Sequence, residues 1–347
     1  MQQSNLVKAG ILAASLTVVA IISWEIYLRQ TYKDLKISYD DNSALWADKR
    51  AMVYDRSDHT TVFIGPSRIK YALDIATWEA VTGDHAVQLA LVGQPDWDSF
   101  DDLANDKKFK GKLIVDVVEG LFFIRDRGDG SKVRTNIGYY HNITPTQKVS
   151  FQINHVLESG FIFLNQDNFS INAMLSKCDL PQREGVWPMP VFPVEFTPVS
   201  FDRQSYMTPN FVKDTNLQNR VKRIWGGGAP RTTPTLIEDS LQAIFKYAKA
   251  DVDKIRSRGG EVIFLRVPTS GPFEEADKKI FPREVCWNRL LAVTGCPGIY
   301  YKDYPAIAHF ICPEWGHLTP EQAAIFTRNL IIILQKEKGW KFTKKIT

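Results

Sequence analysis

The chain has 347 residues, of which 44% are hydrophobic and 24% are charged, so it can bury one large core or two modest ones and is not a disordered protein. Its formal net charge of +4 is spread along the sequence without a sustained basic stripe. This distribution gives no reason to expect a nucleic-acid partner, and we set that class aside.

The N-terminal region is uncharged from Ala9 to Trp24 and continues with apolar residues after a single acidic residue, Glu25. A helix over this run approaches the length of a bilayer's hydrocarbon core, which is roughly 30 Å thick. The bulky residues that follow contain no small-x-small cleavage site, which favours an uncleaved signal anchor over a removed signal peptide or a buried core helix. We therefore predict a membrane anchor over residues 1–30 and a charged, helix-compatible stalk over residues 31–58.

The orientation of this anchor does not follow from its flanking charges. Lys8 precedes the run, whereas Arg29, Lys33 and Lys36 follow it, so basic residues stand on both sides. A short N-terminal anchor before a long domain is the layout of an export signal. We expect a single-pass protein of the cytoplasmic (inner) membrane whose main domain is periplasmic or extracellular.

Four cysteines are present, and their spacing contains no CxxC or Cys/His pattern typical of a metal site. An oxidising compartment permits a disulfide, for which Cys286 and Cys296 are the nearest pair, but unpaired buried thiols are an equally good interpretation. We predict neither a metal site nor a bound cofactor.

Strands and helices alternate through much of the chain. Short apolar, β-branched runs predict parallel strands, and the segments between them have helical patterns. The strands are expected at residues 61–64, 87–91, 113–118 and 261–267. This alternation is typical of a three-layer, doubly wound α/β fold, which we assign to residues 59–347.

The alternation stops between about residues 125 and 235, a region rich in Pro, Trp, Phe and Asn. A segment of this length is too long for a loop in a compact domain, so we predict an insertion that forms a lid or cap with structure of its own. Its aromatic residues would either line a substrate groove or form a small core within the insertion. The second role is the commoner one, and we favour it.

Two segments near opposite ends of the chain carry the side chains of a nucleophilic hydrolase. Ser67 follows the first strand in FIGPSR, where its hydroxyl would face the crevice at the sheet edge, although a plain helix cap is the alternative. His317 precedes the last helix in PEWGHLTP, three residues after Glu314. A serine nucleophile needs an imidazole base, and the imidazole needs a carboxylate. Taken alone, however, His317 is better interpreted as a surface histidine near a helix N-terminus.

Together these segments resemble the first and fifth sequence blocks of the SGNH (GDSL-type) esterase and acetyltransferase superfamily. The segment LALVG, which ends at Gly93, is similar to the middle block. The order of FIGPSR, QLALVG, LIVDVVEGLFF, FLRVPTSGP and HLTPEQAAIFT looks especially like membrane-anchored proteins related to alginate O-acetyltransferases and to the D-alanyl transfer proteins of teichoic acid. The resemblance covers roughly residues 59–125 and 236–335.

This resemblance implies an SGNH/flavodoxin-like fold and a serine acyltransferase or esterase that acts on acyl groups, foremost acetyl, of an extracytoplasmic polysaccharide. Ser67 would be the nucleophile, His317 the general base and Glu314 its orienting acid, with the N–H groups of Ser67 and Gly93 as the oxyanion hole. An acyl donor is the second substrate, and a membrane-bound acyltransferase is a candidate partner. Water and sugar hydroxyls are interchangeable acceptors for an acyl-serine, so hydrolysis and transfer stay open.

Three departures from the family pattern support a competing hypothesis. The turn reads GPS rather than GDS, and Glu314 stands where Asp is usual. The family's oxyanion-binding asparagine has no counterpart, because LIVDVVEGLFF offers Asp116 and Glu119 instead, and losing one such donor costs about 10²- to 10³-fold in rate. The alternative is a catalytically degenerate membrane-anchored protein that binds a glycan or a partner acyltransferase.

Two arginines at expected strand ends, Arg68 and Arg266, complete the candidate site. Either guanidinium would bind a substrate carboxylate or stabilise charge on the acyl group. Ion pairs with nearby carboxylates, such as Asp96 or Asp116, are the equally weighted alternative.

Overall fold

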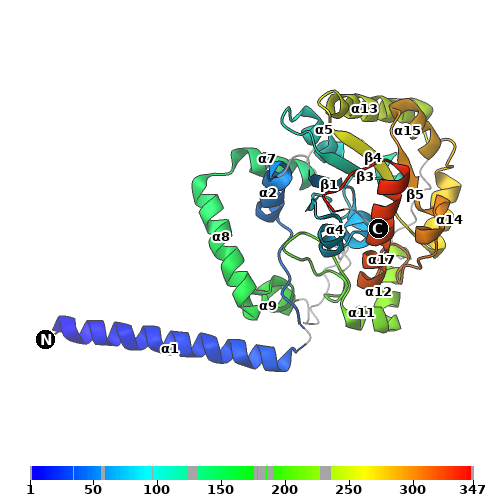
Figure 1. Cartoon of the computed structure of the whole chain (residues 1–347). Coiled ribbons are helices and arrows are strands. Elements are labelled where there is room, and N and C mark those ends of the chain that lie inside the picture. The colour runs from blue at the N-terminus through cyan, green and yellow to red at the C-terminus, as the bar shows by residue number, and fades with distance from the viewer. Residues whose placement is uncertain are drawn as a thin grey trace. The chain divides into compact units, whose positions relative to one another are not determined.

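The protein is described by a computed structural model that covers residues 2–33, 35–55, 59–95, 97–123, 132–175, 178, 185, 191–226 and 236–344 (Figure 1). The chain forms two compact units. The first contains Met1–Asp40 and Thr144–Pro188, and the second contains Asp41–Ile143 and Met189–Thr347. The described part of the region expected to be an insertion is therefore divided between both units.

A five-stranded parallel sheet, in the order β2-β1-β3-β4-β5, forms the centre of the second unit. Its strands are β1 (Thr60–Ile64), β2 (His85–Gln88), β3 (Lys112–Asp116), β4 (Glu261–Arg266) and β5 (Gly298–Tyr300). The predicted α/β class and parallel sheet are confirmed, although the second strand begins and ends earlier than expected. The strand order reverses between β1 and β3, which is where doubly wound sheets bind their ligands.

Alternate residues of each strand face opposite sides of the sheet, so two apolar layers form. On the side of Val62, the core includes residues from α5 (Trp97–Asn105), α13 (Glu238–Arg256) and α15 (Trp287–Thr294). On the side of Phe63, it includes residues from α3 (Ser67–Ala72), α4 (Ile75–Thr82) and α17 (Pro320–Glu337). Helices therefore cover both faces, as the continuous apolar strands predicted.

The segment expected to be a stalk joins the second unit from Asp41 onward. It forms α2 (Ser43–Ala51) and the 3-10 helix η1 (Met52–Tyr54). Trp46 on α2 is fully buried in the core, and its indole N–H donates a hydrogen bond of 2.9 Å to the Leu89 carbonyl. The apolar side chains of α2 therefore place these residues against the core rather than in solvent.

The remaining described helices of the second unit lie mostly between β3 and β4 or after β4. They are α6 (Glu119–Phe122), α7 (Lys132–Asn142), α11 (Pro209–Lys213), α12 (Thr215–Gly226), α14 (Gly271–Ile280), η3 (Tyr301–Asp303) and α16 (Pro305–Ala308). Within the described part of residues 125–235 no strand joins the sheet, and an isolated antiparallel bridge links Val199 and Ser205. A lid or cap function for this region stays a prediction.

The first unit contains α1 (Gln2–Thr31), α8 (Pro145–Gly160), η2 (Ile162–Leu164), α9 (Gln166–Phe169) and α10 (Ile171–Leu175). Among the described residues, α1 is the one helix that is long and apolar enough to cross a membrane. The predicted apolar N-terminal helix is thus present.

Candidate active site

Ser67 occupies the tight turn between β1 and α3. The strand ends at Ile64, Pro66 is the N-cap, and Ser67 is the first helical residue, so its hydroxyl does not cap the helix. Gly65 has a φ of +145°, and a Cβ added there would lie 2.6 Å from the Cβ of Asp116. Only glycine lets this turn pack so closely against the end of β3.

The structure brings Ser67, His317 and Glu314 into one hydrogen-bonded series. Ser67 Oγ lies 2.8 Å from His317 Nε2, although 250 positions separate the two residues. His317 Nδ1 lies 2.9 Å from Glu314 Oε1. An ionised Glu314 accepts a hydrogen bond from the Nδ1–H group of His317, which leaves Nε2 free to accept the Ser67 hydroxyl proton. The expected contact between Ser67 and His317 is therefore present.

The loop between Glu314 and His317 has an unusual backbone conformation. Trp315 has a φ of +78°, which is uncommon for a residue with a side chain. The Trp315 carbonyl accepts a hydrogen bond of 2.9 Å from the Ser270 N–H, and Gly316 donates its N–H to Glu314 Oε1 over 3.1 Å. These contacts hold the strained loop in the conformation that places acid and base together.

Glu314 is fully buried, yet its carboxyl group is held in the ionised form. Burial alone would raise its pKa, but the charge of His317 and hydrogen bonds from His317, Trp225 and Gly316 outweigh burial and lower the pKa below its usual value. The shortest of these hydrogen bonds is donated by the indole N–H of Trp225, whose nitrogen lies 2.6 Å from Glu314 Oε2. Trp225 is thus a site residue that sequence analysis did not identify.

Aromatic rings surround the imidazole of His317. The ring centroids of Tyr71, Phe196 and Trp225 lie 4.5, 5.5 and 6.3 Å from that of His317. Tyr71 and Phe196 are buried members of a small apolar cluster that also contains Met207, and Trp225 packs against this cluster. Some aromatic residues of the 125–235 region therefore form a small apolar cluster together with Tyr71 of α3, and this cluster also contacts the general-base candidate.

Gly93, the second oxyanion-hole candidate, lies in the loop after β2. Leu91 in this loop donates its N–H to the Gly65 carbonyl over 3.0 Å, which places the loop beside the turn that carries Ser67. Gly93 is exposed with a φ of +68°, and a Cβ added to it would meet no atom within 4 Å. The N–H groups of Gly93 and Ser67 would each donate to the oxyanion of a bound substrate, so the role of Gly93 in an oxyanion hole stays a prediction.

Arg68 and Arg266 form a buried ion-pair cluster with Glu119 and Asp277. Arg266 Nε lies 2.6 Å from Glu119 Oε1, and Arg266 Nη2 lies 2.6 Å from Asp277 Oδ2. Arg68 Nη1 lies 3.1 Å from the same Asp277 oxygen and 3.8 Å from Glu119 Oε2. These contacts support the ion-pair alternative over substrate binding. Of the two partners we named, Asp116 forms no ion pair with either arginine within the described part of the chain, and Asp96 lies outside the described residues.

Asp116 is buried at the end of β3, and from the described residues no hydrogen bond of normal geometry reaches either of its carboxylate oxygens. Burial raises its pKa to about 7, against the opposing charges of Arg266 and Arg68 and the nearby Val267 N–H. Asp116 also lines a small apolar cavity together with Pro66, the residue before Ser67. This part of the site therefore supplies a carboxyl group, not the amide donor of the family pattern.

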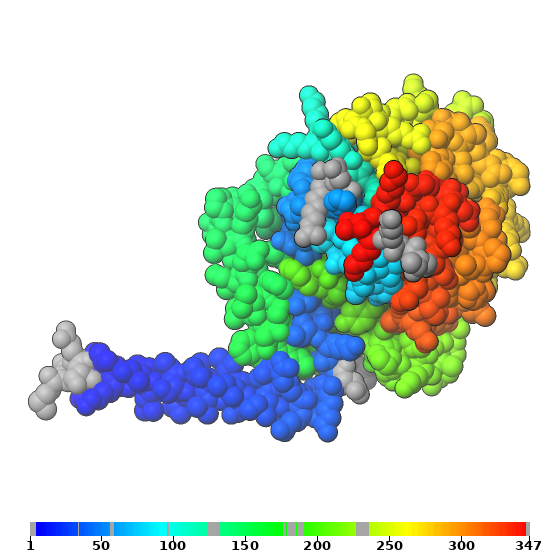
Figure 2. Space-filling model, in the orientation of Figure 1, coloured from blue at the N-terminus to red at the C-terminus, as the bar shows by residue number. Residues whose placement is uncertain are grey.

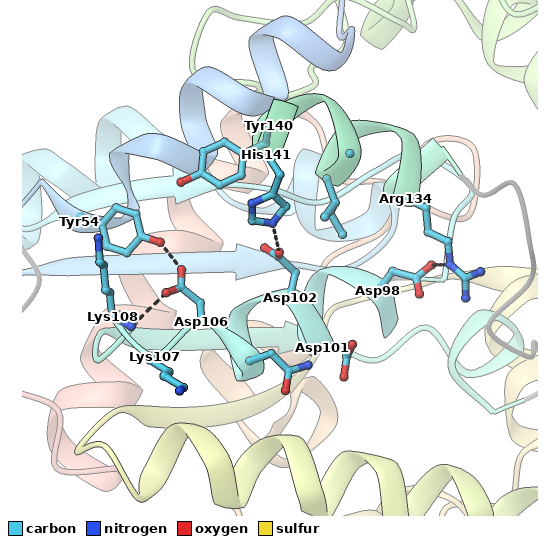
Figure 3. Close-up of a pocket in the computed structure, with 13 residues that line it drawn as sticks. Tyr54, Asp98, Asp101, Asp102, Asp106, Lys107, Lys108, Arg134, Tyr140 and His141 are labelled. Atoms are coloured by element: carbon cyan, nitrogen blue, oxygen red, sulfur yellow. Dashed lines mark hydrogen bonds and ion pairs between the residues drawn. The ribbon is translucent and has the colours of Figure 1, made fainter. Parts of the chain in front are cut away.

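A second pocket, of about 950 Å³, lies between α5 and α7 and is lined by several aspartates (Figure 3). The buried Arg50 bridges Asp102 and Asp106 at 2.7 Å each, and His141 Nε2 lies 3.1 Å from Asp102. Arg134 lies 3.1 Å from Asp98. Three carboxylates of this pocket, those of Asp98, Asp102 and Asp106, are therefore already paired with arginines.

No grouping of three His, Cys, Asp or Glu side chains among the described residues is arranged to hold a metal ion. The four cysteines are free: Cys178 is exposed, and Cys286, Cys296 and Cys312 are buried. The expected nearest pair, Cys286 and Cys296, is therefore unbonded.

Comparison with known proteins does not place the chain in a family. No protein-family model matches it, and no curated protein matches it. Functional assignment therefore depends on the geometry around Ser67 and His317.

Proposed function

We propose that this protein is a serine acyltransferase or esterase of the SGNH type, held by α1 at the outer face of the cytoplasmic membrane. One observation carries the proposal: the series Ser67, His317 and Glu314, with contacts of 2.8 and 2.9 Å. Two residues that are 250 positions apart meet in hydrogen-bonding geometry at the edge of the sheet where parallel α/β folds carry their active sites.

In the first half of the reaction, Ser67 Oγ attacks the carbonyl carbon of an ester while His317 Nε2 accepts the hydroxyl proton. The new Oγ–C bond gives a tetrahedral oxyanion. Its collapse breaks the bond to the leaving alcohol, which takes the proton back from His317 and leaves an acyl-serine. The ionised Glu314 stabilises the transient imidazolium through Nδ1.

In the second half, His317 removes a proton from an acceptor hydroxyl as that oxygen attacks the acyl-serine. Collapse releases the acylated acceptor and returns the proton to Ser67. If the acceptor is water, the product is a carboxylic acid, and if it is a sugar hydroxyl, the product is a new ester. The N–H groups of Ser67 and Gly93 are the proposed oxyanion donors.

The proposed substrate is an acetyl or similar small acyl group on an extracytoplasmic polysaccharide. This follows from the resemblance of the sequence blocks to membrane-anchored acetyl-transfer proteins. An acyl donor, delivered by a membrane-bound acyltransferase partner, is part of the same proposal. The partly exposed ring of Trp225 beside His317 is compatible with a sugar acceptor, whose apolar face packs on such rings.

A second candidate is a catalytically degenerate protein that binds a glycan or a partner acyltransferase. The observation that favours it is the loop after β3, in which Glu119 is held by Arg266 and Asp116 replaces an amide donor. Without that donor the oxyanion would be less stabilised, by about 10²- to 10³-fold in rate.

Covalent labelling with a serine-directed fluorophosphonate separates the two candidates. The intact membrane protein should be labelled on Ser67, and Ser67→Ala and His317→Ala should each abolish labelling and turnover of a small acetyl ester. Ser270→Ala is a matched control, because that serine lies in the neighbouring loop but bonds the Cys312 N–H instead of His317. Absence of both labelling and turnover in the folded protein would favour the degenerate interaction protein.

A further inference from the structure

Helix α8 in the first unit turns its apolar face outward. Val149, Ile153 and Val156 share one face at spacing i, i+4, i+7, and are 59%, 55% and 68% exposed. No residue of this 16-residue helix is buried. A helix that packed its apolar stripe on its own protein would show the opposite pattern.

The opposite face of α8 is the one that contacts the protein. His155 lies on it, with its ring centroid 5.7 Å from that of Tyr39, and the neighbouring Ser159 hydroxyl lies 2.7 Å from the Tyr39 hydroxyl. Phe151, His155 and Glu158 repeat at the same i, i+4, i+7 spacing and are all partly buried. The mixed, largely polar face is thus turned inward and the apolar stripe outward, an arrangement that calls for an apolar environment outside the chain.

The C-terminal end of α8 is joined to the C-terminal part of α1. Glu25 accepts hydrogen bonds from the Ile162 and Phe163 N–H groups at 2.9 and 3.3 Å. Arg29, which pairs with Glu25 at 2.6 Å, donates to the carbonyl of Gly160 over 3.0 Å. The one acidic residue of the apolar run is therefore paired with Arg29 of the same helix and hydrogen-bonded to the segment that follows α8.

This junction lies where α1 would leave a bilayer. The uncharged residues 9–24 of α1 rise roughly 24 Å, which approaches the hydrocarbon core of roughly 30 Å, and Lys8 lies at its far boundary. Trp24 and Tyr27, both exposed, stack with ring centroids 5.5 Å apart, and such rings are enriched at the membrane–water interface. The exposed Lys33 follows them, a position suited to anionic headgroups. Gly160 is consequently held at the level of the interface.

We propose that α8 is an interfacial helix, whose stripe of Val149, Ile153 and Val156 inserts into the lipid bilayer beside α1. Figure 1 shows α8 running crosswise to α1 within their unit, as a helix in the plane of the membrane does when α1 crosses it. Figure 2 shows the green residues of α8 uncovered on the face in view. Insertion of such a stripe reaches roughly 5–10 Å into the boundary between headgroups and acyl chains. The second unit would thereby receive two attachments to the membrane surface instead of one.

The test uses the full chain in vesicles of phosphatidylethanolamine and phosphatidylglycerol. In a Cys178→Ser background, an environment-sensitive fluorophore is attached to Val156→Cys or, as a matched exposed control on the same helix, to Asn154→Cys. We expect nitroxide-labelled lipids to quench the probe at position 156 several-fold more strongly than the probe at 154, and a water-soluble quencher to show the reverse order. Ile153→Asp should abolish the lipid quenching at 156 while α1 keeps the chain in the membrane.

Two outcomes would overturn the proposal. Equal, weak lipid quenching at both positions would show that the stripe faces water. Shielding of position 156 from the water-soluble quencher without lipid quenching would show that a protein, a second copy or a partner, covers α8. Fluorophosphonate labelling of Ser67 is measured separately and does not depend on either result.

Discussion

Two buried carboxyl groups at the same edge of the sheet, Glu314 and Asp116, are in opposite electrostatic states. Both are almost inaccessible to solvent. Yet the pKa of Glu314 is lowered, whereas burial raises the pKa of Asp116 to about 7. Burial therefore does not decide which form a carboxyl group takes at this edge.

The difference lies in the hydrogen-bond donors that each group receives. Glu314 accepts from the Trp225 indole, the Gly316 N–H and the His317 ring, which together outweigh the cost of burying its charge. Asp116 has two arginines nearby, but Glu119 and Asp277 already pair with them, and no donor of normal geometry among the described residues reaches its oxygens. A serine–histidine site needs a fixed negative charge behind the imidazole, and only Glu314 supplies it.

The largest effect is expected from removing the charge of Glu314 while keeping its shape. Glu314→Gln should lower kcat for a small acetyl ester by about 10²- to 10⁴-fold and leave residual activity, because the imidazolium loses its stabilising partner. The measurement is steady-state turnover, with circular dichroism as the control for folding. Unchanged kcat would remove Glu314 from the site.

Disrupting the ion-pair cluster of Arg68, Arg266, Glu119 and Asp277 should lower the stability of the protein rather than its catalytic rate. Arg266→Met leaves Glu119 and Asp277 as buried charges with too few cations, and should lower the free energy of unfolding by about 3–5 kcal/mol. Arg283→Met is the matched control, since its exposed pair with Asp303 contributes about 1 kcal/mol or less. Equal destabilisation by both variants, measured by denaturation in detergent, would contradict a structural role for the cluster.

The sequence predicts those parts of the site whose residues lie in short local motifs, and it does not predict contacts between segments that are far apart along the chain. Ser67, Glu314 and His317 were identifiable because each lies in a short local motif, and because parallel strands bring their following loops to one edge of the sheet. The pairing of Glu314 with His317 spans only three positions, so one loop supplies both.

The features that sequence analysis missed depend on contacts between segments without a repeating pattern. Trp225 reaches Glu314 across 89 positions, from a region with no strand–helix alternation. Sequence analysis did not name the observed partners of Arg266, because Glu119 lies one turn beyond β3 and Asp277 lies within α14. The outward apolar stripe of α8 was missed because periodicity shows that a helix is amphipathic but not which face it buries.

A smaller loss of activity is expected when Glu314 loses the hydrogen bond from the Trp225 indole, a donor that Asp116 lacks. Trp225→Phe removes the 2.6 Å hydrogen bond but keeps an aromatic ring beside His317. Because hydrogen bonds to charged groups contribute about 1.5–3 kcal/mol, kcat/KM should fall by about tenfold or somewhat more. Trp46→Phe is the control, as its indole donates to a neutral backbone carbonyl in the core. A similar loss of activity in both variants would mean that Trp225 acts only through packing.

The smallest and most pH-dependent effect is expected for Asp116→Asn. With a pKa raised from 3.8 to about 7, the folded protein holds a proton on Asp116 that the unfolded chain has lost at intermediate pH. Stability from this group is therefore fully present below pH 3.8, falls as pH rises towards 7, and stays low above it. The total loss is at most about 4 kcal/mol, since one pKa unit corresponds to about 1.4 kcal/mol.

Asparagine cannot ionise, so Asp116→Asn should escape this loss, but its unpaired buried amide costs about 1–3 kcal/mol. The variant should then be about 1–2 kcal/mol more stable than the unaltered protein at pH 8 and less stable at pH 4, so that the two stability curves cross. Asp303→Asn, at an exposed ion pair, should show no such crossing. Parallel curves for Asp116→Asn and the unaltered protein, measured by denaturation between pH 4 and pH 8, would mean that Asp116 is ionised in the fold. Asp116 would then share the ionised state of Glu314, and the charges of Arg266 and Arg68, rather than hydrogen-bond donors, would offset the cost of its burial.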